Sequence, residues 1–139
     1  MTDALQVIQP VFDDDGKEIV FWVAARGHHT DIGGLGGNSG HPNQTERWEE
    51  GVAFDSTFIV RDGVFNEREI IETFMEAGTY PGCKATKRID HNISDLKAQC
   101  SACAVGTAQL HALFDEYGKA VVHFYMKGEP IPAHRSAAH

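Results

Sequence analysis

Two strand-like segments around an acidic turn near the N-terminus predict a β-hairpin. One strand is expected from Leu5 to Phe12 and a second from Ile19 to Ala25, with the acidic, glycine-containing turn 13–17 between them. Because the second segment is apolar on both faces, we expect it to be a central strand of a sheet. A third strand is predicted from Phe54 to Arg61, and a short return follows at Val64–Phe65.

Helical periodicity takes over in the second half of the chain. Asn66 with Glu69 three residues later is typical of a helix start, and this helix is expected to end at Gly78. A longer helix is predicted to begin near Asn92, which we expect to cap it, and to end at Gly118. Its apolar stripe has alternating spacings of four and three and consists of Leu96, Cys100, Cys103, Thr107, Leu110, Phe114 and Tyr117.

Together these elements predict an α+β fold with an N-terminal β-hairpin and further strands, a glycine-rich loop and a long C-terminal helix. A last helix is expected to start within 120–126. The length of 139 residues suits a single domain, which we place at residues 1–126, followed by a flexible tail at 127–139.

Composition excludes several classes of function. The net charge of -8 disfavours a nucleic-acid or anionic-membrane surface, since phosphate contacts need clustered lysine and arginine. No apolar run approaches the length of a membrane helix, and no signal peptide is recognisable, so we expect a cytoplasmic protein. Three cysteines cannot all pair within one chain, and we expect Cys100 and Cys103 to be core residues rather than a redox or zinc pair.

The candidate chemistry lies where the second strand meets the glycine-rich loop. His28, His29 and Asp31 have the side chains that bind divalent metals and act as general bases. Adjacent residues of a strand point to opposite sides, so only one of the two histidines is expected to face any site. From spacing alone, two interpretations of these three residues are equally supported: a polar strand end with a structural role, and a functional site. The glycines of the loop match neither the dinucleotide fingerprint nor the phosphate-binding P-loop.

Several blocks of sequence resemble a known family. The most specific are Arg26–Gly34, with the sequence RGHHTDIGG, and Asn92–Gln99, with the sequence NISDLKAQ. Shorter matching stretches are Glu49–Gly51, Gly63–Glu67 and Tyr80–Cys83. On these blocks the chain resembles the hydantoinase B/5-oxoprolinase family, and most closely the C-terminal half of the ATP-dependent 5-oxoprolinases.

The resemblance implies a hydrolase that acts on a cyclic amide. In the complete enzyme, 5-oxoproline is opened to glutamate with ATP, a step of the γ-glutamyl (glutathione) cycle, and ATP is bound by the half that this chain lacks. The resemblance also implies a divalent metal (Mn²⁺, Mg²⁺ or Zn²⁺). Carried onto this chain, its expected ligands are His28, His29 and Asp31, and the expected catalytic residues are Asp31, His29, Asn92 and Asp95.

Family members are far longer than 139 residues, so we expect a partial domain that is inactive alone. Its expected partners are a small cyclic amide and either a second copy of itself or the missing half of the enzyme, with no nucleic acid and no membrane. The alternative is a non-enzymatic metal-binding or docking module that associates with a full-length homologue.

Overall fold

The computed structural model describes residues 4–36 and 43–128. It divides the chain into two compact units, residues 1–103 and residues 104–139, which are described separately below. The elements combine strands with three α-helices, so the predicted α+β class is confirmed. The part of the glycine-rich loop at 37–42 and the predicted tail from 129 onward lie outside the described residues.

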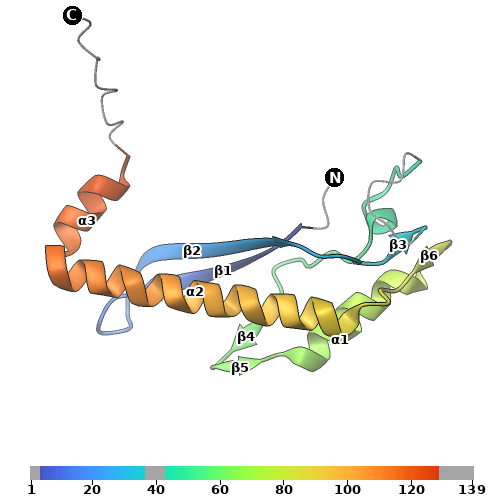
Figure 1. Cartoon of the computed structure of the whole chain (residues 1–139), viewed down its shortest axis with the longest axis horizontal. Helices are drawn as coiled ribbons and strands as arrows, with labels where there is room; N and C mark the ends of the chain where they lie inside the picture. The colour runs from blue at the N-terminus through green and yellow to red at the C-terminus, as the bar shows by residue number, and fades with distance from the viewer. Residues whose placement is uncertain (1–3, 37–42, 129–139) are drawn as a thin grey trace, which may run out of the picture. The chain divides into compact units, whose positions relative to one another are not determined.

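The first unit opens with the predicted hairpin (Figure 1). Strand β1 (Ala4–Phe12) pairs antiparallel with β2 (Ile19–His28), in a register that sets Pro10 opposite Trp22. The turn closes because the Asp13 carboxylate accepts the backbone N–H of Lys17 at 2.8 Å. Strand β2 runs past its predicted end, so the first of the two histidines is still in the strand.

The predicted central position of β2 is wrong within the described part of the chain. There β2 pairs only with β1, in a two-stranded sheet. Its residues alternate in exposure: Val23 and Ala25 pack against the core, whereas the Trp22 side chain is 60% exposed. The pattern is apolar on both faces, but the described residues cover only one of them.

The third predicted strand is shorter than expected. Only β4 (Val60–Arg61) forms, paired with β5 (Val64–Phe65) across a turn. The preceding segment is tied to Asn66 instead, whose side chain donates to the Phe58 carbonyl at 2.7 Å and whose backbone N–H donates to the Ile59 carbonyl at 2.9 Å. The pairing cannot extend further because the partner segment turns into helix α1 at Glu67.

Helix α1 (Glu67–Glu76) starts where it was predicted and continues into the 3₁₀ turn η2 (Ala77–Thr79). Its inward residues Ile70 and Phe74 are fully buried. Two further short elements, β3 (Gly34–Leu35) and β6 (Cys83–Lys84), pair with each other, and the 3₁₀ helix η1 (Arg47–Glu50) precedes the third-strand region.

Helix α2 (Ile89–Tyr117) begins three residues before its predicted start. Asn92 therefore lies inside the first turn, where its backbone N–H donates to the Arg88 carbonyl, and the prediction that it caps the helix is wrong. The hydroxyl of Thr86 accepts the Arg88 N–H at 3.0 Å, in the turn just before the helix begins. Asn92 is thus free to use its side chain elsewhere.

The hydrophobic core of the first unit joins β1, the loop after β2, α1 and the first turns of α2. Its buried members are Val7, Ile32, Val52, Ile70, Phe74, Ala77, Ile93, Leu96 and Cys103. In the second unit, α2 ends as predicted at Gly118, which has a φ of 81°, and α3 (Lys119–Met126) follows, with Phe114 stacked on His123. None of the described helices combines the length and apolar character needed to cross a membrane.

Candidate functional site

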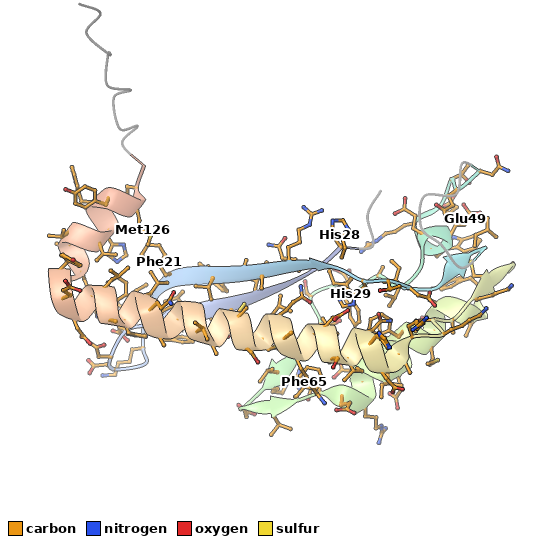
Figure 2. All side chains as sticks on the ribbon, in the orientation of Figure 1. Phe21, His28, His29, Glu49, Phe65 and Met126 are labelled. Atoms are coloured by element: carbon orange, nitrogen blue, oxygen red, sulfur yellow. The ribbon has the colours of Figure 1, made fainter. Side chains whose placement is uncertain are left out.

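The two adjacent histidines leave the chain in opposite directions. His28 is the last residue of β2 and is exposed, whereas His29 is only 2% exposed. Figure 2 shows His28 on the outer side of the strand and His29 between the strand and α2. The prediction that the pair diverges is confirmed, and the divergence separates one imidazole open to solvent from one that is built into the fold.

The buried imidazole of His29 faces polar side chains of α2. Its Nδ1 lies 3.4 Å from Asn92 Oδ1 and 3.9 Å from Asp95 Oδ2. Its Nε2 lies 3.4 Å from Gln99 Oε1. These three partners recur at spacings of three and four residues along α2, so one face of the helix presents all of them to the strand end.

Asn92 links this histidine to the loop that follows it. The side chain is fully buried, and its Nδ2 donates to the Asp31 carbonyl at 2.8 Å and to Thr86 Oγ1 at 3.1 Å. With Oδ1 directed at His29, one amide contacts three residues from two segments, the end of β2 with its loop and the stretch before α2. Such a buried polar group stabilises the fold only because all its partners are present.

Asp31 holds the loop in shape through its carboxylate. Oδ1 accepts the Gly33 N–H and Oδ2 accepts the Lys87 N–H, both at 2.8 Å. The first bond closes a local turn of the Asx type, and the second ties this turn to the segment that leads into α2. The Asp31 backbone carbonyl also accepts a hydrogen bond from Thr86 Oγ1 at 2.9 Å.

The double glycine after Asp31 lets backbones approach closely. Gly33 and Gly34 have φ values of 82° and 96°. A Cβ on Gly33 would lie 2.5 Å from the Lys84 carbonyl oxygen, and one on Gly34 would lie 2.5 Å from that of Glu49. This part of the glycine-rich loop is therefore explained by packing of the backbone against its neighbours.

The structure brings together four of the predicted site residues: His29, Asp31, Asn92 and Asp95. The fifth, His28, points away from this group (Figure 2). The sequence-based prediction missed Gln99 and Thr86. Gln99 continues the spacing of Asn92 and Asp95 along one helix face, a signal that was readable; Thr86 had no such signal, because its role depends on where α2 begins.

The predicted metal shell is not complete within the described residues. No group of three histidine, cysteine, aspartate or glutamate side chains there has the geometry to hold a metal ion. Both ring nitrogens of His29 face amide oxygens, and both carboxylate oxygens of Asp31 accept backbone N–H groups. The metal assignment stays a prediction. Of its three residues, His28 is the one whose side chain is open to a ligand.

The cysteines of α2 are core residues, as predicted. Cys103 belongs to the hydrophobic core, and Cys100 packs against it. Burial raises the pKa of both thiols above the usual range for cysteine, and for Cys100 the nearby Cys103 adds to the effect. Neither thiol has the lowered pKa that is typical of a redox-active pair.

These raised pKa values predict a loss of stability in alkali. The unfolded thiols ionise near about pH 8.5, whereas the folded ones resist ionisation. Their contribution to stability is therefore fully present below that pH and is lost as the pH rises from there through the higher pKa values of the folded thiols. We expect the free energy of unfolding, measured in urea, to fall less between about pH 7 and about pH 9.5 in a Cys100→Ala/Cys103→Ala variant than in the parent chain. An equal fall in the free energy of unfolding over this pH range in the two proteins would contradict this prediction.

Comparison with known proteins gives a consistent result. A model of the hydantoinase B/oxoprolinase family matches residues 2–131. The 5-oxoprolinase PfmaA of Pestalotiopsis fici is 45% identical over 89% of this chain, and the 5-oxoprolinase of Saccharomyces cerevisiae is 44% identical over 88% of it. The caprolactamase subunit beta of Pseudomonas jessenii is 34% identical over 73% of the chain. No solved structure gives a significant match.

The matched segment is a small part of each relative. The chain spans 10% of the length of each of the two 5-oxoprolinases and 16% of that of the caprolactamase subunit.

Proposed function

The chain belongs to the hydantoinase B/oxoprolinase family, and on that premise we propose that it is one segment of a hydrolase that opens cyclic amides. The observation that carries this proposal is the packing of two sequence blocks, 26–34 and 92–99, which are distant in the chain but meet through His29 and Asn92. A family-specific pair of blocks that forms one buried hydrogen-bonded unit is what a shared site architecture requires.

The proposed substrate is 5-oxoproline. The two relatives with 44–45% identity are named for it, and the more distant caprolactamase subunit is named for another lactam. The cyclic amide is the chemistry that these names share. With this substrate, the product is glutamate, ATP is supplied through other segments of the enzyme, and the reaction belongs to glutathione metabolism. A cytoplasmic location stays a prediction.

This segment contributes structure to the site. Amide hydrolysis needs a base for the attacking water and donors for the oxygen that gains negative charge. In the described residues, His29, Asn92 and Asp31 are engaged in holding the loop against α2, and His28 is exposed at its start. We assign His28 the solvent-facing role of base or ligand, and the other three the role of keeping its backbone in place.

We propose further that the isolated chain does not turn over substrate. A site must hold several groups in a fixed geometry at once, and of the two predicted site histidines only His28 presents an open imidazole. The segments that make up the other nine-tenths of the relatives' length would supply the remaining groups and the ATP site.

A chimera tests the proposed function. Residues 4–128 of this chain would replace the matched segment of the S. cerevisiae 5-oxoprolinase, and ATP-dependent turnover of 5-oxoproline would be measured for the chimera, the parent yeast enzyme and the isolated chain. We expect turnover in the chimera and none in the isolated chain. A folded chimera that opens caprolactam but not 5-oxoproline would contradict the substrate, and turnover by the chain alone would contradict the proposed dependence on other segments.

The outer face of the hairpin is where we place the contact with those segments. Ile8 and Trp22 are exposed apolar residues, and they alternate with the inward-facing residues of β1 and β2. Their cross-strand neighbours, Ala24 and Pro10, complete an apolar strip on the same face. Exposed strips of this kind mark protein contacts, and nine-tenths of the relatives' length is available to cover it.

In the absence of those segments, we expect the isolated chain to self-associate through this strip. Sedimentation velocity should show concentration-dependent oligomers for the parent chain and a shift toward monomer for Trp22→Glu. Phe58→Glu is the matched control, since Phe58 is equally exposed, at 60%, but lies outside the hairpin. A monodisperse parent monomer, or an equal response of both variants, would contradict the assignment of this face.

A further inference from the structure

Gln99 occupies the junction between the hairpin and the first turns of α2. Its side chain is almost completely buried. Its Nε2 donates to two strand carbonyls, that of Leu5 at 2.9 Å and that of Ala25 at 3.1 Å. One amide nitrogen has two hydrogens, so both are used, and both strands of the hairpin are tied to the helix by the same group.

These two bonds fix which way round the amide lies. A carbonyl oxygen accepts and cannot donate, so the group facing the two strand carbonyls must be the NH₂ of Gln99. Its Oε1 is then directed at His29 Nε2, 3.4 Å away. The orientation of Asn92 is fixed in the same way by the Asp31 carbonyl, which leaves Asn92 Oδ1 facing His29 Nδ1.

The backbone next to this junction is shaped to receive the amide. Gly27 lies on β2, two residues before His29, and a Cβ built there would be 3.3 Å from Gln99 Nε2. That distance is closer than an ordinary carbon contact, so a side chain at position 27 would press on the amide. The absence of a side chain at Gly27, in the RGHH block, therefore leaves room for the Gln99 amide of the NISDLKAQ block.

From this geometry we infer that Gln99 is a positioning residue, which orients the buried ring of His29 and takes that ring out of use as a ligand. Each ring nitrogen faces an amide oxygen of fixed orientation, which can only accept, so a neutral ring donates its one N–H to one amide while the other amide oxygen lies in front of the remaining nitrogen and blocks it from a metal or a substrate. The two adjacent histidines thus divide their roles: His29 anchors the strand end to α2, and His28 is presented outward. The inference concerns the free chain and does not depend on which substrate the complete enzyme takes.

The test follows the imidazole of His29 by nuclear magnetic resonance in the ¹⁵N-labelled chain, without metal or substrate. The ring signals are assigned by their absence in a His29→Asn variant. Gln99→Met keeps the side-chain length but removes the amide. The matched control is Gln109→Met, at an exposed position of the same helix. We expect a slowly exchanging ring N–H signal of His29 in the parent and the control, and its loss or displacement in Gln99→Met.

A second variant keeps the inference falsifiable if Gln99→Met fails to fold. Gly27→Ala leaves both side chains intact but pushes the Gln99 amide by a few tenths of an ångström. We expect the His29 ring signal to shift while the chain still unfolds cooperatively. A buried glutamine with a purely structural role would lower stability without changing which ring nitrogen carries the proton or how fast that N–H exchanges with water. An unchanged His29 signal in the folded variants would therefore overturn the inference.

Discussion

Replacing Gly34 by alanine should lower the free energy of unfolding by at least about 3 kcal/mol. Two effects add at this position. A φ of 96° is unfavourable for any residue with a Cβ, and the new Cβ would meet backbone atoms of Glu49, Glu50 and Gly51 at 2.5–2.7 Å. Backbone cannot rotate out of the way as a flexible side chain can, so β3 and η1 must separate.

The matched control for this variant is Gly16→Ala in the hairpin turn. Gly16 also has a positive φ, of 68°, but nothing lies within 4 Å of the Cβ position. Its expected cost is therefore the backbone term alone, about 1 kcal/mol. Urea denaturation of both variants measures the difference. If both variants lose the same free energy of unfolding, the close approach of the loop to η1 does not explain why Gly34 is a glycine.

Asn92→Leu is expected to cost about 3 kcal/mol. Leucine has a similar volume but leaves several buried groups without their partner, among them the Asp31 carbonyl, the Thr86 hydroxyl and the His29 ring. Each unsatisfied buried group costs about 1–3 kcal/mol, offset in part by the apolar surface that leucine buries.

His91→Leu serves as the control for Asn92→Leu, because His91 is the preceding residue of α2 and is exposed. We expect that change to stay within about 0.5 kcal/mol of the parent. Circular dichroism in urea measures both variants. A loss of less than about 1 kcal/mol for Asn92→Leu would mean that the Asn92 amide is not the link between the loop and the helix.

Local patterns predicted much of the fold. The hairpin followed from two strand-like segments around an acidic turn, α1 from its starting pattern and terminal glycine, and the C-terminal end of α2 from periodicity and Gly118. The error at Asn92 shows what local patterns miss. Asn92 looks like a helix cap from its neighbours in sequence, but its partners His29 and Asp31 are 63 and 61 residues away, and such contacts leave no local signal.

The same limit applies to the candidate site. Spacing alone marked His28, His29 and Asp31 as chemistry-bearing, and only the family blocks connected them to Asn92 and Asp95. That the two histidines point to opposite sides followed from strand alternation, but which of them turns inward depended on the packing of α2.

Blocks 26–34 and 92–99 form one unit through the contact between His29 and Asn92. A double-mutant cycle tests it most directly, with free energies of unfolding measured for His29→Leu, Asn92→Leu and the double variant. Removing both polar partners leaves fewer unsatisfied groups than the two single changes together. We predict that the double variant is more stable than the sum of the single losses by at least about 1 kcal/mol, whereas strictly additive losses would contradict the claim.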